Sequence, residues 1–210
     1  MSDLFNYDLY YLKDYDFICG IDEVGRGSLA GPLVVCGVIM KYDYEIDGIM
    51  DSKKLSSKKR EELDKLIKEH VYEYFILEVD VETIDKKNIY QATRDAMNEI
   101  ANNIIDKNVL VLSDAMKLNS VNNISIIKGD ATSYAIASAS IVAKVYRDKL
   151  MDFLHLSYPM YDFKNNKGYG TKKHILALKE FGFIKDIHRE SFEPVKSMCS
   201  SQIKFNFEDE

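Results

Sequence analysis

Short β-branched apolar runs alternate along the chain with longer segments of helical pattern. Runs of this kind, separated by polar and turn-forming residues, predict strands over 17–22, 32–40, 73–79, 108–114 and 124–130. Helical spacing of apolar residues and helix-favouring composition predict helices over 57–70, 88–105, 132–156 and 172–182. The resulting order, β-β-α-β-α-β-β-α-α, is typical of an α/β fold with a mixed five-stranded central sheet flanked by helices.

The composition is that of a globular protein and not of a membrane or secreted one. The 210 residues, 46% hydrophobic and 30% charged, suffice for one large domain with its own core. No apolar run approaches the roughly 18 residues of a membrane span, and the acidic, aromatic N-terminus does not resemble a secretion signal. Three widely spaced cysteines exclude a disulfide framework and a cysteine zinc site. We therefore expect a cytoplasmic protein without a membrane partner.

The distribution of charge adds one qualification to this picture. A net charge of −6 argues against indiscriminate coating of nucleic acid. Basic residues are nevertheless concentrated in two segments, residues 51–60 with a net charge of +4 and residues 161–196 with a net charge of +3. Charge alone leaves open whether these segments contact phosphates or are simply solvated surfaces.

Carboxylates end three of the predicted strands, at Asp22-Glu23, Asp114 and Asp130. In an open α/β sheet the strand ends are where loops assemble a site. A single acid of this kind is usually a turn former or a helix cap, and Asp130 is placed to cap the helix beginning near Thr132. Four acids together repel one another unless a cation joins them. Oxygen ligands without histidine or cysteine favour Mg²⁺ or Mn²⁺, and such a cluster suits two-metal phosphodiester cleavage.

The adjacency of Asp22 and Glu23 poses a geometric difficulty, because consecutive side chains on a strand point to opposite faces. Both can reach one site only if the strand ends or bulges there, which Gly25 and Gly27 would permit.

The segment VGRGSLAGP (24–32) superficially matches a dinucleotide-binding fingerprint at Gly25, Gly27 and Ala30. That fingerprint must open a helix, whereas here Gly31-Pro32 and a β-branched run follow at once, so we reject a nucleotide cofactor. Two interpretations stay open. The segment is either a plain hairpin turn with an exposed arginine, or a turn whose backbone approaches a ligand closely and whose guanidinium pairs with phosphate.

Taken together, these residues resemble ribonuclease HII over nearly the whole chain, from about residue 17 to residue 197. The resemblance rests on six segments in the same order: GIDEVGRGSLAGP (20–32), DSKKLS (51–56), SDA (113–115), KGDATSYAIASASIVAKVYRD (128–148), KGYGTKKH (167–174) and HRESFEPVK (188–196). The first two segments are highly specific to that family.

The resemblance implies a ribonuclease H-like fold with a C-terminal helical extension. It divides the chain into an N-terminal extension (1–16), a catalytic core (17–157), a C-terminal helical part of the same domain (158–200) and a flexible tail (201–210). The implied activity is hydrolysis of the RNA strand of RNA–DNA hybrids, and incision 5′ to ribonucleotides embedded in duplex DNA. It would leave 3′-hydroxyl and 5′-phosphate ends.

The resemblance also assigns roles to particular residues. The metal-binding and catalytic quartet would be Asp22, Glu23, Asp114 and Asp130. The substrate-binding residues would be Gly25, Arg26 and Gly27 as reader of the ribose 2′-hydroxyl, Tyr169 beside the RNA–DNA junction, and Lys53 and Lys54 on phosphates. A backbone turn can contact a 2′-hydroxyl without reading a base, and an aromatic ring can stack on a nucleotide. Without the resemblance, the alternative interpretation is that Tyr169 is a surface residue without a function.

The C-terminal residues suggest one further partner. Gln202, Phe205 and Phe207 resemble the short peptides that bind the bacterial replication clamp, and the alternative is a frayed acidic tail. The related ribonuclease HIII carries an extra N-terminal domain, for which about 16 residues leave no room. We expect a monomer.

Three other functions remain as alternatives. Another two-metal nuclease or strand-transfer protein on the same fold would cleave all-DNA substrates. A binding protein that has lost catalysis would have no use for four repelling carboxylates. An α/β domain whose acids are only helix caps would not be stabilised by divalent metal.

Overall fold

The computed structural model describes residues 1–104, 108–119 and 122–199. The chain divides into two compact units. Unit 1 comprises Met1–Val24, Val34–Glu78 and Thr93–Tyr146, and unit 2 comprises Gly25–Leu33, Val79–Ala92 and Arg147–Glu210. The division at residues 16, 157 and 200 that the resemblance implied stays a prediction.

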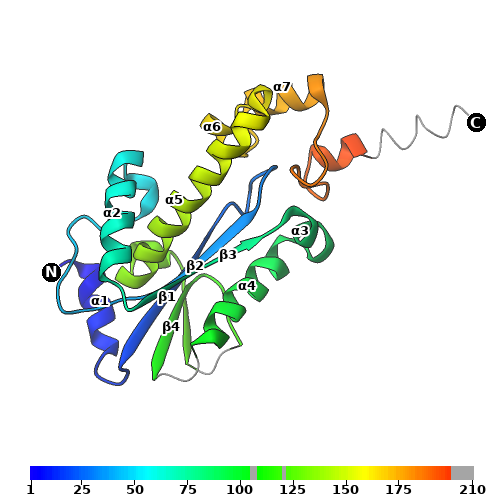
Figure 1. The fold of residues 1–210 in the computed structure, drawn as a ribbon. Helices are drawn as coiled ribbons and strands as arrows, with labels where there is room; N and C mark the ends of the chain where they lie inside the picture. Colours follow the sequence, from blue (N-terminus) through cyan, green and yellow to red (C-terminus); the bar gives the residue numbers. More distant parts are fainter. Residues whose placement is uncertain (105–107, 120–121, 200–210) are drawn as a thin grey trace, which may run out of the picture. The chain divides into compact units, whose positions relative to one another are not determined.

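Unit 1 contains the five-stranded mixed sheet that the sequence predicted (Figure 1). The strand order is β3-β2-β1-β4-β5, with β1 antiparallel to β2 and parallel to β4, and β4 parallel to β5. The bounds are Phe17–Val24 (β1), Leu33–Ile39 (β2), Glu73–Val79 (β3), Val109–Asp114 (β4) and Asn123–Ile126 (β5). The last strand is shorter than predicted, because the chain leaves the sheet at Ile126 and turns through a left-handed residue at Lys128.

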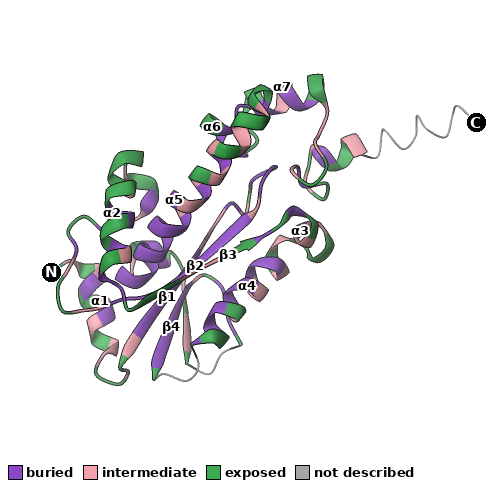
Figure 2. Ribbon diagram, in the orientation of Figure 1, coloured by how far each residue is buried: buried purple, intermediate pink, exposed green. Residues whose placement is uncertain are grey.

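Helices cover both faces of this sheet, and two glycines set how closely they approach. A Cβ on Gly37 of β2 would meet Ile100 of helix α4 (Ile89–Asn103) at 2.5 Å. On the other face, a Cβ on Gly20 of β1 would lie 2.1 Å from the backbone of Ala135, at the start of helix α5 (Tyr134–Ser157). Figure 2 shows β1, β2 and β4 buried along almost their whole length between these helices.

Two further helices complete unit 1. Helix α2 (Ser57–His70) has the predicted bounds, and the Ser56 hydroxyl caps its first turn by accepting from the amide of Lys59. Helix α1 (Asp3–Tyr11) lies in the segment expected to be an extension, yet it packs into the core of unit 1 through Phe5 and Asp8. The ring centroid of Phe5 lies 5.0 Å from that of Tyr134.

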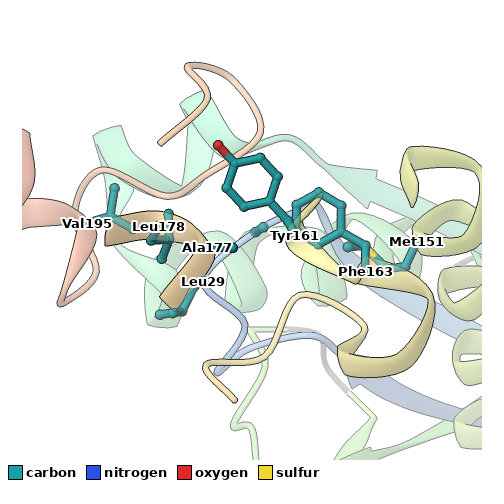
Figure 3. Packing of buried hydrophobic residues seen from close by; sticks show 8 residues of the cluster. Leu29, Met151, Tyr161, Phe163, Ala177, Leu178 and Val195 are labelled. Carbon is teal, nitrogen blue, oxygen red and sulfur yellow. The ribbon is translucent and has the colours of Figure 1, made fainter. Parts of the chain in front are cut away.

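Unit 2 is built from short helices around its own apolar cluster (Figure 3). Its helices are α3 (Val81–Lys87), α6 (Phe163–Asn166) and α7 (Lys172–Phe181), with the last eleven residues of α5. The rings of Tyr161 and Phe163 lie nearly parallel, with centroids 5.5 Å apart. The cluster is completed by Leu29, Ala30, Met151, Ala177, Leu178 and Val195. Among the helices of the described residues, none is both long and apolar enough to cross a membrane.

Candidate active site

Two of the four predicted acids lie side by side on strand β1. Pairing with β2 continues regularly through Asp22, Glu23 and Val24, so the strand has no bulge at this point. The strand ends at Val24, one residue beyond Glu23, and the convergence of both side chains on one site stays a prediction. Asp22 is buried, and its Oδ1 accepts a hydrogen bond of 2.8 Å from the amide of Glu23.

Electrostatics link Asp22 to two of the other acids in unit 1. Burial raises the pKa of Asp22 well above its usual value, and the negative charges of Glu23 and Asp114 raise it further. A hydrogen bond with Ser140 of α5 acts in the opposite direction. These carboxylates are therefore close enough to disfavour one another's ionisation, which is the repulsion that a cation would relieve.

Asp114 and Asp130 are brought together by a short turn of 3₁₀ helix. Asp114 is the last residue of β4, and its Oδ1 accepts a hydrogen bond of 2.7 Å from the amide of Gly129. Asp130 lies in the turn η2 (Gly129–Ala131) and does not end a strand, which corrects the sequence-based placement. It is not the cap of α5 either, since the Ser133 hydroxyl accepts from the amide of Ile136.

Lys53 contributes positive charge beside these acids. Its Nζ lies 3.5 Å from Oδ2 of Asp130, although its side chain is 80% exposed. Burial would lower the pKa of Lys53, but the negative charges of Asp130, Asp51 and Asp22 outweigh burial and raise it. Both Lys53 and Lys54 lie on the turn η1 (Ser52–Lys54) and are exposed to solvent, and their contact with phosphates stays a prediction.

The donor chemistry of the four acids fits a hard divalent cation. All the ligand atoms are carboxylate oxygens, the type that Mg²⁺ and Mn²⁺ prefer. The side chains do not form a ready cage, however: within the described residues, no three or more His, Cys, Asp or Glu side chains are grouped as metal ligands. The chemistry of these donors fits such a cation, and the assignment of Asp22, Glu23, Asp114 and Asp130 as its ligands stays a prediction.

The segment of residues 25–27, called the glycine turn below, belongs to unit 2. Its two glycines, both predicted to contact the ribose 2′-hydroxyl, differ in their surroundings. Gly25 has a φ of +93°, and a Cβ on it would lie 2.3 Å from Nε of Arg147. Gly27 is exposed, has no positive φ, and would place its Cβ 3.9 Å from Cε1 of Tyr169. The fold of unit 2 therefore requires glycine at position 25 and does not require it at position 27.

Two fully buried arginines hold this turn in place. The Arg147 guanidinium donates to the carbonyls of Pro32 (2.9 Å), Lys167 (2.8 Å) and Ala30 (3.1 Å). Arg189 donates twice to Gly31 O (3.2 and 2.9 Å) and once to Arg26 O (3.0 Å). Burial lowers the pKa of Arg189 to about 9, and the charge of Arg147 contributes. Sequence reasoning missed both residues, because an arginine is most often exposed.

Tyr169 lies in a second loop of unit 2 that is tied to the glycine turn. The amide of Leu29 donates to the carbonyl of Gly168 at 2.8 Å, joining the two loops. The Tyr169 side chain is partly exposed, at 39%, and the Arg147 Cζ lies 5.8 Å from its ring centroid. Tyr169 is therefore accessible to a ligand while the guanidinium of Arg147 lies near its ring.

The tail positions Gln202, Phe205 and Phe207 lie outside the described residues. The predicted site residues therefore fall into two sets within the part that is described. The acids and lysines lie in unit 1, and the glycine turn and Tyr169 lie in unit 2.

Comparison with known proteins places these motifs in a family. The family model for ribonuclease HII matches residues 19–195. The chain is 49% identical over 197 residues to ribonuclease HII of Macrococcus caseolyticus, covering 92% of this chain and 74% of the relative. It is 46% identical over 193 residues to ribonuclease HII of Leuconostoc citreum, covering 91% and 74%.

Solved structures share the fold. Ribonuclease H2 from Pyrococcus horikoshii gives a TM-score of 0.68 at 24% identity, covering 90% of this chain and 99% of that one. The PCNA:RNase HII complex from Archaeoglobus fulgidus contains a chain with a TM-score of 0.66 at 25% identity, covering 82% and 92%. A Mn²⁺ complex of Bst-RNase HIII gives 0.67 at 15% identity, covering 88% and 70%.

Proposed function

This chain belongs to the ribonuclease HII family of metal-dependent hydrolases that act on RNA–DNA hybrids, and on that premise we propose which of its residues carry out the hydrolysis and which recognise the ribonucleotide. The acids of unit 1 hold divalent metal and carry the hydrolysis. The glycine turn and Tyr169 of unit 2 recognise the ribonucleotide. The observation that carries the proposal is geometric: β1, which carries Asp22, pairs in parallel with β4, and β4 ends at Asp114, whose Oδ1 accepts from the amide next to Asp130.

The reaction assigned to the acids is hydrolysis 5′ to a ribonucleotide, giving 3′-hydroxyl and 5′-phosphate ends. Two Mg²⁺ or Mn²⁺ ions, when bound, would activate the attacking water and stabilise the leaving oxygen. The ions would be held and oriented by the carboxylates of Asp22, Glu23, Asp114 and Asp130. The amide of Gly129 fixes one oxygen of Asp114 by a hydrogen bond. Lys53 and Lys54 bind substrate phosphates from the exposed turn η1.

Recognition of RNA is assigned to Gly25, Arg26 and Gly27, with Tyr169 stacking beside the junction. A 2′-hydroxyl can be contacted by backbone groups where no side chain intervenes, and this is what allows a protein to distinguish RNA from DNA. Gly27 supports the assignment because its glycine identity has no explanation in the packing of unit 2. The exposure of Tyr169 to solvent supports a stacking role.

The decisive experiment compares a labelled DNA duplex carrying one ribonucleotide with the same duplex in all-DNA form. Each is incubated with Mg²⁺, Mn²⁺ or EDTA, using wild type and Asp114→Asn. We expect metal-dependent incision 5′ to the ribonucleotide only, abolished by the substitution. Cleavage of both duplexes would instead indicate a general nuclease. Binding without cleavage by folded wild type would indicate a reader that has lost catalysis.

A second experiment tests the glycine turn separately from the acids. Gly27→Ala places its Cβ 3.9 Å from Cε1 of Tyr169, an ordinary contact without a clash, so the variant should unfold at the wild-type temperature while losing about tenfold or more in cleavage 5′ to the ribonucleotide. Lys54→Gln is the comparison on the phosphate side, and it should weaken binding of both duplexes equally. Unchanged cleavage by Gly27→Ala would remove the turn from substrate recognition.

We also propose that the C-terminal segment from Gln202 to Phe207 binds the replication clamp. A relative of this fold forms a complex with PCNA, a sliding clamp, which supports a clamp partner for this chain. Deleting residues 201–210 should abolish binding to the bacterial clamp and leave cleavage of a short duplex unchanged. Retained clamp affinity in the truncated chain would dispose of the proposal.

A further inference from the structure

Two buried histidines of unit 2 connect the Tyr169 loop to the segment that follows α7. His174 Nδ1 lies 3.0 Å from the carbonyl oxygen of Tyr169, and His174 Nε2 lies 3.2 Å from His188 Nε2. The amide of Ile184 donates to His188 Nδ1 at 2.9 Å. Both histidines have no solvent-exposed surface. Neither has a role in the hydrolysis described above.

The two ends of this chain of contacts fix the direction of every hydrogen bond in it. A backbone carbonyl can only accept, so His174 must carry its proton on Nδ1. A backbone amide can only donate, so His188 Nδ1 must be unprotonated and its proton must lie on Nε2. His188 Nε2–H then donates to the bare Nε2 of His174. One pair of neutral tautomers satisfies all four ring nitrogens, and no other pair does.

We propose that His174 and His188 form a hydrogen-bonded relay that positions Tyr169 for the ribonucleotide. The relay rests on the role proposed above for Tyr169, and it makes the two histidines positioning residues, not catalytic ones. His174 holds the Tyr169 carbonyl, while Arg147 lies against the ring of the same residue. The Tyr169 carbonyl also accepts from the amide of Thr171 at 2.8 Å, and His174 adds a side-chain donor that fixes this carbonyl from a second direction.

The surroundings keep the relay neutral. Burial lowers the pKa of His174, and burial together with the neighbouring His174 lowers the pKa of His188 to about 4. The rings of Tyr161 and Phe163 pack around the pair, with Tyr161 4.9 Å from His188 and Phe163 5.4 Å from His174 between ring centroids. These two rings belong to the apolar cluster of Figure 3. A proton added to either histidine would set two N–H groups against each other.

The tautomers can be measured directly in the wild-type protein. In ¹⁵N-histidine-labelled enzyme at neutral pH, we expect His174 to be protonated at Nδ1 and His188 at Nε2, each with one bare nitrogen. Assignment would come from the His174→Asn and His188→Asn variants. Any other tautomer pair, or a charged ring at this pH, would overturn the relay whatever the activity of the variants.

Two substitutions of His174 separate positioning from general stability. His174→Asn keeps an N–H near the Nδ1 position for the Tyr169 carbonyl but leaves His188 without an acceptor. His174→Gln keeps an acceptor near the Nε2 position for His188 but removes the imidazole N–H from the Tyr169 carbonyl, which keeps the Thr171 amide. Both remove the imidazole, so their packing losses are matched. Only the glutamine variant should raise KM for the single-ribonucleotide duplex, by about fivefold, with kcat within about twofold.

A Tyr169→Ala background completes the test. If His174 acts through Tyr169, the difference in KM between the glutamine and asparagine variants should vanish in that background. Equal KM values for the two variants in the wild-type background would overturn the relay. Reduced kcat with unchanged KM in both would also overturn it, because loss of folded enzyme has that signature. If wild type fails to cleave at all, the proposed function falls first, and the tautomer measurement still decides the geometry.

Discussion

The buried guanidinium of Arg147 provides the sharpest test of how the glycine turn is held. We predict that Arg147→Lys destabilises the protein even though the positive charge is kept. The planar guanidinium donates to three carbonyls, those of Ala30, Pro32 and Lys167, from different nitrogen atoms. An ammonium is a single point, so it can approach only one of these oxygens well and leaves two buried acceptors without their donor.

The magnitude follows from the two lost bonds. A buried polar group left without its partner costs about 1 to 3 kcal/mol, so we expect a loss of about 3 kcal/mol in the free energy of unfolding. For a chain of 210 residues this corresponds to a fall of about 6 to 12 °C in Tm. The charge itself is not the cause, because lysine carries the same charge in the same buried place.

The assay is urea unfolding followed by circular dichroism, with Arg94→Lys as the matched control. The hydrogen bond from Arg94 to Asn119 is exposed, so that variant should lie within about 0.5 kcal/mol of wild type. A loss no larger for Arg147→Lys than for the control would refute the reasoning. It would mean that the turn is held by its own backbone contacts and that the arginine is dispensable to it.

Three other predictions concern the fold and the metal. Gly20→Ala should cost about 3 kcal/mol or prevent folding, since its Cβ would overlap the backbone of Ala135; Gly27→Ala is the tolerated control in thermal melts. Because the folded pKa of His188 lies below its unfolded value, its neutral form stabilises the protein above pH 6.5, and this contribution is lost as the pH falls toward 4. Burial raises the pKa of Asp8 to about 6, and this changes stability with pH in the opposite sense. We therefore compare wild type with His188→Gln: the stability of wild type relative to the variant should fall by about 3 kcal/mol between pH 7 and pH 4. A difference that stays constant with pH would contradict the prediction for His188. Mg²⁺ at ten times its Kd should stabilise wild type by about 1.4 kcal/mol and should not stabilise Asp114→Asn; equal thermal shifts would place the metal elsewhere.

The sequence predicted the sheet and its principal helices because these depend on local patterns. Helix α2 has the predicted bounds because its segment has helix-forming composition. The end of the fifth strand was wrong, because ISIIKGD continues the apolar pattern beyond Ile126 while the left-handed conformation of Lys128 ends it. No local rule anticipates that conformation at a lysine.

The sequence placed Asp22, Glu23 and Asp114 correctly at the ends of strands and placed Asp130 wrongly, while the role of these acids as metal ligands stays a prediction. Carboxylates at strand ends leave a clear trace in the sequence, and the resemblance to ribonuclease HII added their grouping. The roles of Arg147 and of the histidine pair depend on loops that are far apart in sequence, such as 25–33 and 167–174. The distinction between Gly25 and Gly27 has the same origin, because only packing against Arg147 separates two glycines that look alike in a motif.

The buried carboxylate of Asp8 has a consequence for when this chain can fold. Its Oδ2 accepts a hydrogen bond of 2.7 Å from the amide of Ala135, 127 residues later, and another from the hydroxyl of Tyr42. At a ribosomal rate of about 5 to 20 residues per second, the first helix therefore emerges about 6 to 25 s before its partner exists. During that interval the apolar side of α1 has no place to bury Phe5. The nascent chain should then be a substrate for chaperones until the start of α5 has emerged, and truncated chains ending before Ala135 should aggregate.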